Sequence, residues 1–244
     1  MSGIRNIVIL TGAGISAESG LRTFRAEDGL WEDHRVEDVA TPQAFRRDPE
    51  LVQRFYDMRR ANVLAARPNP AHEALARLDA QWPDDDDHEL LIVTQNIDDL
   101  HERAGAQFGL AHGRLLHMHG QALSAWCTAC DARHHWTGTL LDGPPCPACG
   151  TAALRPDIVW FGEMPYEMER IFAALARAHL FVSIGTSGAV YPAAGFVQAA
   201  AGAGARTLEL NLDRSQGSHW FDETRLDPAS KTVPAWVDEV LAQP

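Results

Sequence analysis

Four cysteines form the most specific chemical pattern in this 244-residue sequence. Two residues separate Cys127 from Cys130, two separate Cys146 from Cys149, and fifteen lie between the pairs. Thiolates at this spacing bind Zn²⁺ in a closed tetrahedral site that leaves no coordination position for a substrate. Disulfides and a redox dithiol are the alternatives, but both are disfavoured in a chain for which we expect no secretory leader. The spacing therefore predicts one structural zinc ion per chain.

A glycine-rich turn near the start of the sequence could hold a phosphate group. Gly12, Ala13 and Gly14 follow the apolar run IVIL at 7–10, which predicts a short buried strand. A strand that leads through such a turn into a helix directs backbone N–H groups at one point, and Ser16 would cap that helix. The glycines would let the backbone approach a pyrophosphate closely. An ordinary strand-to-helix turn explains these residues equally well, because the third glycine of the usual dinucleotide-binding motif is missing.

A cation and aromatic rings follow this turn in a stretch that predicts a loop. Thr23, Phe24 and Arg25 come first, and Trp31 follows Gly29 and Leu30. An aromatic ring in a loop has little reason to lie there unless it covers something. We therefore expect these residues to close over a bound ligand.

Polar residues also follow three further apolar runs. They are Gln95-Asn96-Ile97-Asp98 after ELLIV at 89–93, Gly185-Thr186-Ser187 and Asn211-Leu212-Asp213. Ligands of an open parallel sheet bind at the carboxyl ends of its strands, where these side chains would lie. The structural alternatives are helix capping by Asn96 or Asp98 and simple turns at the other two places.

Two histidines end another expected strand. Strand alternation places His117 and His119 on one face with Leu115, so the period alone does not choose between them. An imidazole with a pKa near neutrality suits a general base. A packed, hydrogen-bonded histidine is the alternative for either residue.

Tyr56 and Arg59 lie three residues apart in an expected helix that begins at Pro49-Glu50 and ends near Ala66. That spacing places both side chains on one helix face. Together the phenol and the guanidinium could bind a carboxylate, for which the planar fork of arginine is well suited. The alternative is that Arg59 belongs to a solvated basic face with Arg54 and Arg60.

Alternating strands and helices must position these residues. They predict a doubly wound α/β domain with a mostly parallel sheet of the dinucleotide-binding, Rossmann-like type. We expect this large domain to comprise residues 1–32, 71–121 and 156–244. Residues 33–70 and 122–155 would form a small helical and zinc-binding module, with the active site in the cleft between the two. A closing helix is expected over 234–241, with Ala229 in the loop before it.

Composition limits the partners. The formal net charge is −12, which argues against nucleic acid and favours a basic peptide. No apolar run approaches the length of a membrane span, and no charged-then-apolar leader precedes the first strand. We therefore expect a cytoplasmic protein without membrane contact, and we expect it to be a monomer.

The segment GAGISAESGLRTFRAEDGLW at 12–31 resembles the cofactor-binding loop of the sirtuins, a family of NAD-dependent protein-lysine deacylases. The motifs QNID at 95–98, HG at 119–120 and WFGE at 160–163 resemble sirtuin motifs as well. Tyr56 and Arg59 match the Tyr-x-x-Arg pair of the bacterial CobB-type, desuccinylase-like branch, and the resemblance covers almost the whole chain.

The resemblance implies a role for each matched residue. It implies catalytic roles for His119 as the base and for Asn96 and Asp98 in orienting water and the nicotinamide carboxamide. It implies acyl and peptide contacts by Ala40, Tyr56, Arg59, Val159, Trp160, Phe161, Gly162 and Glu163. It implies contacts to NAD by Gly12, Ala13, Gly14, Ser16, Thr23, Phe24, Arg25, Trp31, Gln95, Asn96, Ile97, Asp98, Gly185, Thr186, Ser187, Asn211, Leu212, Asp213 and Ala229.

The resemblance also implies the reaction. NAD would be a consumed co-substrate, and acetyl, succinyl or malonyl groups would leave lysine with release of nicotinamide and O-acyl-ADP-ribose. Two other classes of function stay open on the sequence. An ADP-ribosyltransferase would use the same cleft, and a non-catalytic acyl-lysine-binding module would need no base.

Overall fold

The computed structural model describes residues 3–22, 30–31, 34–109 and 113–242. Its larger sheet has six strands in the order β11-β10-β9-β1-β4-β5, and every neighbouring pair is parallel. The strands are β1 (Asn6–Thr11), β4 (Glu89–Thr94), β5 (Leu115–His117), β9 (Leu180–Ile184), β10 (Arg206–Asn211) and β11 (Glu223–Leu226). The predicted doubly wound, mostly parallel fold is confirmed.

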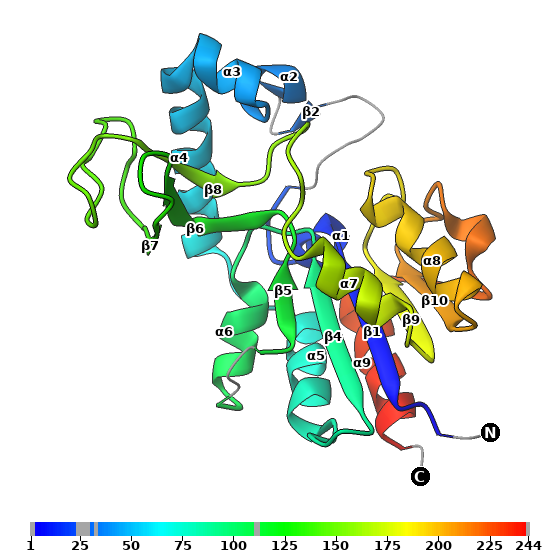
Figure 1. Ribbon diagram of the computed structural model, residues 1–244. Coiled ribbons are helices and arrows are strands. Elements are labelled where there is room, and N and C mark those ends of the chain that lie inside the picture. The colour runs from blue at the N-terminus through cyan, green and yellow to red at the C-terminus, as the bar shows by residue number, and fades with distance from the viewer. Residues whose placement is uncertain (1–2, 23–29, 32–33, 110–112, 243–244) are drawn as a thin grey trace.

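Helices cover both faces of this sheet (Figure 1). One face packs against α5 (Pro70–Gln81) and α9 (Ala229–Leu241), and the other packs against α7 (Met168–Leu175) and α8 (Phe196–Gly202). Two more helices, α1 (Ala13–Ala17) and α6 (Leu100–Ala106), follow β1 and β4, and two 3-10 turns lie at Ala193–Gly195 and Ser218–Trp220. Because both faces are covered, the central strands are almost continuously apolar, and Ile7 and Ile9 are fully buried.

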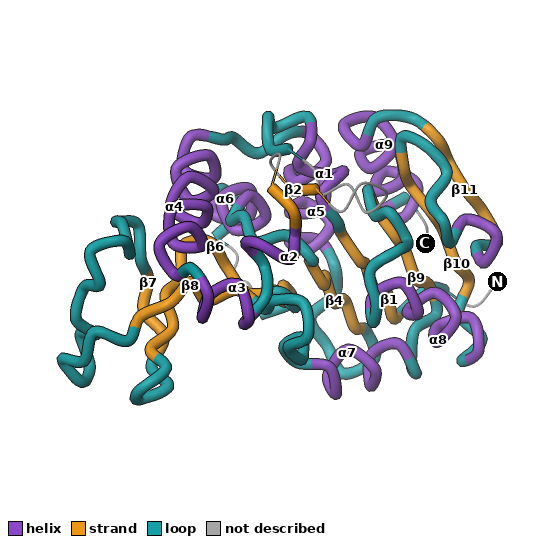
Figure 2. Tube along the Cα trace, turned by 90° about the horizontal axis from the view of Figure 1, so that it is seen from above, coloured by secondary structure: helices purple, strands orange, loops and turns teal. Residues whose placement is uncertain are grey.

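A smaller unit lies beyond the carboxyl ends of the large sheet (Figures 1 and 2). It contains a three-stranded antiparallel sheet in the order β7-β6-β8 and a two-stranded ribbon, β2-β3. The strands are β2 (Leu30–Trp31), β3 (His34–Arg35), β6 (Gly120–Cys127), β7 (Arg133–His135) and β8 (Leu154–Ile158). The helices are α2 (Val36–Val39), α3 (Pro42–Arg47) and α4 (Pro49–Ala65).

Side-chain caps explain where several helices begin. Thr41 accepts a hydrogen bond from the backbone of Ala44, Asp48 accepts one from Leu51, and Asn69 accepts one from Ala71. A proline occupies the first turn of each of these helices, where its missing N–H costs nothing. The expected helix start at Pro49 is confirmed, and the Thr41-Pro42 pair likewise predicts the start of α3.

Three expectations about local structure are wrong. Helix α9 begins at Ala229 and includes Pro234, so Ala229 is the first helical residue and does not lie in the preceding loop. The apolar run from Ile158 predicts a strand that leads into a loop by Glu163, whereas β8 ends at Ile158 and residues 159–163 follow it. Ser16 is buried within α1, whose N-cap is Gly12.

A shared core joins the segments that we assigned to the small module. Side chains from α2, α3 and α4 pack with Ala122 of β6, Ile158 of β8 and Trp160, and Ile97 and Leu100 extend the cluster to the large sheet. The exact boundaries of the two domains stay a prediction. Within the described residues, no helix combines the length and apolar character needed to cross a membrane.

Candidate active site and zinc centre

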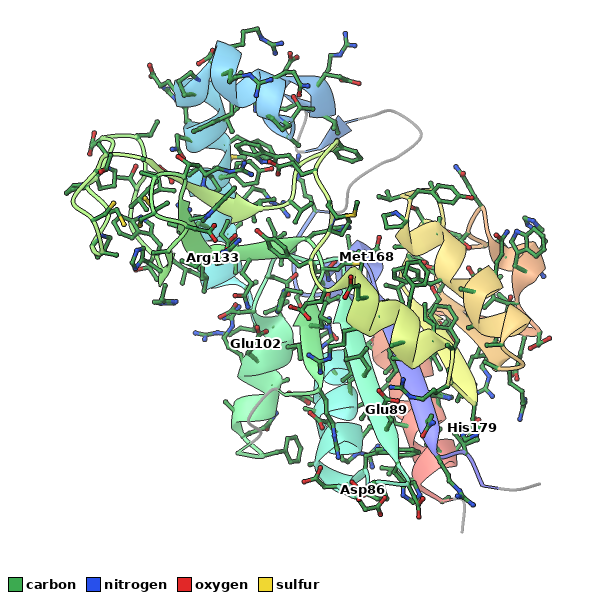
Figure 3. The ribbon with its side chains drawn as sticks, in the orientation of Figure 1. Asp86, Glu89, Glu102, Arg133, Met168 and His179 are labelled. Carbon is green, nitrogen blue, oxygen red and sulfur yellow. The ribbon has the colours of Figure 1, made fainter. Side chains whose placement is uncertain are left out.

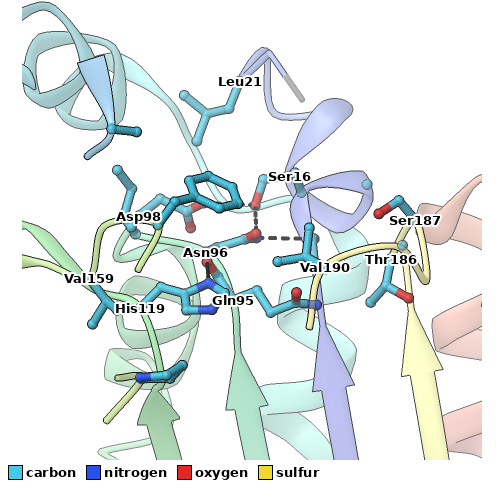
Figure 4. Close-up of a pocket in the computed structure, with 18 of the residues that line it drawn as sticks. Ser16, Leu21, Gln95, Asn96, Asp98, His119, Val159, Thr186, Ser187 and Val190 are labelled. Carbon is cyan, nitrogen blue, oxygen red and sulfur yellow. Dashed lines mark hydrogen bonds between the residues drawn. The ribbon is translucent and has the colours of Figure 1, made fainter. Parts of the chain in front are cut away.

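A cavity of about 700 Å³ lies where the carboxyl ends of β1, β4 and β9 face the small unit (Figure 4). From the predicted NAD and catalytic residues it is lined by Gly12, Ala13, Gly14, Ser16, Gln95, Asn96, Ile97, Asp98, His119, Gly185, Thr186, Ser187, Asn211, Leu212 and Asp213. From the predicted substrate residues it is lined by Ala40, Tyr56, Arg59, Val159, Trp160, Phe161, Gly162 and Glu163. The fold therefore brings together residues from eight separate stretches of the sequence.

Some predicted residues are not placed in this cavity. Thr23, Phe24 and Arg25 lie outside the described residues, as does the side chain of Trp31. Ala229 does not line the cavity and packs partly against the core beneath α9. The contacts proposed for these residues stay predictions.

The glycines at the end of the cavity where we expect the nucleotide let two loops pack closely against each other. A Cβ on Gly14 would lie 2.7 Å from the Gly185 Cα, and Gly185 has a φ of +61°, which favours glycine. The N–H of Gly12 donates to the Ile184 carbonyl and that of Gly14 donates to the Gly185 carbonyl. These two N–H groups are therefore not directed at a phosphate, contrary to our expectation. A side chain at Gly14 or at Gly185 would push the two loops apart and fill the space between them.

Ser16 connects two strand-end residues. Its hydroxyl donates to Oδ2 of Asp98 at 3.0 Å and accepts from Nδ2 of Asn96 at 3.0 Å (Figure 4). The Asn96 amide also donates to the Gly12 carbonyl, and His72 Nε2 lies 3.4 Å from the Ser16 hydroxyl. Burial raises the pKa of Asp98, although bonds from Leu100 N–H and Ser16 act in the opposite direction. The Asp98 carboxylate also accepts from the backbone N–H of Leu100, the first residue of α6, but the N-cap of that helix is Asp99, so neither Asn96 nor Asp98 is its N-cap.

His119 reaches the cavity and His117 does not. Strand β5 ends at His117, so the alternation expected between the two residues does not extend to His119. Nδ1 of His119 lies 3.1 Å from the Gln95 carbonyl oxygen, which can only accept. Nδ1 therefore carries the hydrogen and Nε2 has the lone pair. Burial lowers the pKa of His119, which keeps this ring neutral and suited to accept a proton.

Helix α4 contributes Tyr56 and Arg59 to the end of the cavity where we expect the acyl group. Tyr56 and Arg59 are both buried, and the indole Nε1–H of Trp160 donates to the Tyr56 hydroxyl at 3.0 Å. Burial raises the pKa of the Tyr56 phenol, so it stays protonated at neutral pH. Arg54 is exposed and pairs with Glu50, whereas Arg60 is buried. The alternative of one solvated arginine face is therefore wrong for Arg59 and Arg60.

Residues 159–163 form a bridge between the two units. Val159 N–H donates to the His119 carbonyl, and Phe161 N–H donates to the Ala40 carbonyl. Glu163 accepts from the Trp160 N–H and forms two bonds with Arg155, at 2.8 and 3.0 Å. These bonds fix the segment beside the general-base candidate, and pairing with a substrate peptide stays a prediction.

The four cysteine sulfurs lie within 4.8 Å of one another. Cys127 and Cys149 are separated by 3.8 Å, and Cys130 and Cys146 by 3.7 Å. Four thiolates about 2.3 Å from one zinc ion stand about 3.8 Å apart along each tetrahedral edge. All four thiols are free, so the cluster fits one Zn²⁺ held by four thiolates. None of them lines the cavity, which suits a structural metal.

Several residues that line the cavity were not among the predicted site residues. They are Leu21, Arg22, Ile158, Pro165, Val190, Tyr191, Pro192, Arg214, Ser215 and Gln216. Arg214 and Ser215 directly follow the polar group at 211–213, so the stretch that lines the cavity extends further along the chain than predicted. Tyr191 and Pro192 lie beyond the turn after β9, and no pattern in the sequence ties that loop to the cavity.

The fold and the cavity define a nucleotide-binding α/β protein with an inserted four-cysteine module. The Sir2 family model matches residues 12–192. The chain belongs to the Sir2 family, whose members are also called sirtuins.

Similar proteins agree with this assignment. The NAD-dependent protein deacylase of Bdellovibrio bacteriovorus is 54% identical over 240 residues, and the match covers 97% of each chain. That of Caulobacter vibrioides is 50% identical over 244 residues, with both chains fully covered. The crystal structure of a Sir2 homolog–NAD complex has 36% identity and a TM-score of 0.84, over 97% of this chain and 90% of that one. A structure of Sir2 bound to acetylated peptide has 27% identity and a TM-score of 0.78, over 97% and 93%.

Proposed function

We propose that this protein is an NAD-dependent protein-lysine deacylase that removes acetyl, succinyl and malonyl groups from lysine. One observation carries the proposal: a single cavity joins a glycine-lined nucleotide end, a neutral histidine and an acyl end with a buried arginine. Relatives named NAD-dependent protein deacylase match nearly the full chain, which supports the reaction class.

The residues have distinct roles in this proposal. NAD, when bound, supplies the ribose that accepts the acyl group, with release of nicotinamide. Residues 12–14, 185–187 and 211–213 hold the nucleotide, and Asn96 and Asp98 orient the nicotinamide side. Nε2 of His119 accepts a ribose hydroxyl proton, because its Nδ1–H is held by the Gln95 carbonyl. The Asn96 and Asp98 side chains are held in turn by Ser16.

The acyl end of the cavity has side chains that can bind acidic acyl groups. A succinyl or malonyl carboxylate would enter a largely apolar tunnel beside Ala40 and Trp160, where an unpaired charge is costly. The Arg59 guanidinium and the protonated Tyr56 hydroxyl can both donate to that carboxylate. An acetyl group lacks the carboxylate and would be bound without these bonds.

We further propose that the enzyme acts in the cytoplasm, as a monomer, on lysine-bearing protein segments. The net charge of −12 favours basic peptides over nucleic acid. Fractionation of cells and sizing of the purified protein test the location and the oligomeric state.

The deciding experiment incubates acetyl- and succinyl-lysine peptides with the purified protein, with and without NAD, and analyses the products by mass spectrometry. We expect free lysine, nicotinamide and O-acyl-ADP-ribose, all dependent on NAD. ADP-ribose attached to protein would instead indicate a transferase. Peptide binding without any turnover would indicate a non-catalytic binding module.

A further inference from the structure

Two histidines hold two consecutive carbonyl groups at the floor of the cavity. Nδ1 of His119 lies 3.1 Å from the Gln95 oxygen, and Nδ1 of His117 lies 3.1 Å from the Asn96 oxygen. Because a carbonyl oxygen only accepts, Nδ1 carries a hydrogen in both rings. The two rings therefore differ only in the partner of Nε2.

Nε2 of His117 faces a carboxylate. It lies 2.8 Å from Oε1 of Glu102 on α6, at the side of the helix that faces β5 (Figure 3). The same oxygen accepts from the amide of Gln121 at 3.0 Å, so Oε1 acts as an acceptor toward two donors. With acceptors at both nitrogens, the His117 ring donates twice and is an imidazolium.

The charges around this ring favour that state. Burial lowers the pKa of His117, but the bond and charge of Glu102 outweigh burial and raise it above its usual value. Burial likewise raises the pKa of Glu102, and His117 more than reverses that effect. The other titratable neighbours are Asp98, which attracts the imidazolium, and His101 and His119, whose lowered pKa values keep them neutral.

We infer that His117, held by Glu102 as a twofold donor, is a positioning residue for residues 95–98. It fixes the Asn96 carbonyl and with it the peptide from which the Asn96 side chain extends toward Ser16. Asp98, two residues on, is held by the same serine. The inference rests on the function proposed above, because it concerns the nicotinamide side of the proposed site.

Two substitutions separate the two bonds of the ring. In His117→Asn the amide nitrogen occupies the place of Nδ1, so the bond to the Asn96 carbonyl is kept and the bond to Glu102 is lost. In His117→Gln the amide nitrogen occupies the place of Nε2, so the opposite holds. A residue that merely filled space or stabilised the fold would not separate the two variants in this way.

We expect His117→Gln to weaken NAD binding and raise the KM for NAD by about tenfold, the size of one lost bond to a charged group. We expect His117→Asn to stay within about threefold of the wild type. Calorimetric titration with NAD gives the affinity without turnover, and melting temperatures show whether stability follows a different order. Equal NAD affinities for the two variants would overturn the inference, and so would a greater loss in His117→Asn.

Two readouts address the charge itself. In the ligand-free protein, ¹H–¹⁵N NMR of the imidazole nitrogens should show both nitrogens of His117 protonated at neutral pH, and one nitrogen of His119. In Glu102→Gln the same NMR titration should give a lower pKa for His117, because the carboxylate that holds the imidazolium is removed. A neutral His117 in the NMR spectrum would overturn the inference.

The outcomes also separate this inference from the proposed function. A wild-type protein that binds NAD without deacylating any peptide would refute the proposed function, while NMR and NAD affinity would still decide the role of His117. Failure to bind NAD would overturn both.

Discussion

Arg59→Met tests whether the acyl end selects acidic acyl groups. Methionine keeps the length and much of the apolar contact of the arginine stem but removes the cation and its donors. Arg59 is 5% exposed, so a bound carboxylate near it would be screened little by water. The substitution therefore removes a charged partner from the tunnel without opening a large cavity there.

The expected effect follows from the bonds that are lost. A hydrogen bond to a charged group contributes about 1.5 to 3 kcal/mol, and 1.4 kcal/mol corresponds to about tenfold. Arg59→Met should therefore lower kcat/KM for desuccinylation by about 10- to 100-fold. Deacetylation, which makes no such bond, should stay within a few-fold. Tyr56→Phe removes a neutral donor, so desuccinylation should fall by a smaller factor, and the Trp160 indole loses its acceptor.

The assay compares succinyl- and acetyl-lysine versions of one peptide by mass spectrometry at substrate concentrations below KM. Arg54→Met is the matched control, because Arg54 lies on the same helix but is exposed and pairs with Glu50 one turn earlier. We expect the control to leave both activities unchanged. Melting temperatures of all variants show whether the helix has been damaged.

A parallel loss of both activities in Arg59→Met would refute this reasoning. Arg59 would then be a structural part of α4, and the assignment of an acidic-acyl pocket would be withdrawn. Loss in the Arg54 control would mean that the assay reports the fold of the helix instead of its bonds to the acyl group.

Three further predictions concern the base, the metal and acid stability. His119→Ala should lower turnover by about a hundredfold or more with zinc content unchanged, whereas near-normal turnover would transfer the role to solvent. Because burial lowers the pKa of His119, the acid limb of kcat/KM should lie below pH 6.5, and a limb above that value would contradict its role. Purified protein should contain about one zinc per chain, and Cys149→Ser should lose it and unfold the segment around 127–153; intact activity without zinc would end that prediction. Burial lowers the pKa of His72 to about 3 and that of His101 well below its usual value, so unfolding takes up protons below about pH 6.5. As the pH is lowered below about 6.5, the free energy of unfolding should therefore fall by about 1.4 kcal/mol per pH unit for each ring. A melting temperature that stays constant from pH 6.5 to 5 would count against this prediction.

Much of the fold could be predicted because its signals are local. Apolar runs such as IVIL at 7–10 and the prolines at 42 and 49 mark where strands and helices begin, and the cysteine spacing alone indicates the metal. The carboxyl ends of parallel strands meet at one edge of the sheet, so most residues that line the cavity could be predicted from the polar groups that follow these strands. The error at Ala229 has a local cause, because Pro234 indicated a helix start although it lies one turn inside α9.

The remaining features depend on partners far away in the sequence. The roles of the two histidines are set by Glu102, fifteen residues from His117, and by two carbonyls that follow β4. Ser16 appeared to be a helix cap because its partners, Asn96 and Asp98, are about eighty residues away. Arg54, Arg59 and Arg60 look alike in the sequence of α4, but Arg59 and Arg60 are buried and Arg54 is exposed. The packing of α4 on the small sheet decides which of them are buried.

Helix α4 also links the metal centre to the acyl end. Its buried Arg60 donates to the carbonyls of Ala122 and Gly138, and the carboxylate of Asp57 accepts from the backbone of Leu140. Residues 138 and 140 belong to the loop between the two cysteine pairs, so the zinc-bearing loop is fastened to the helix that carries Tyr56 and Arg59. Although a closed zinc site has no place for a substrate, we therefore expect loss of the metal to disturb α4 and, through Tyr56 and Arg59, the proposed selection among acyl groups.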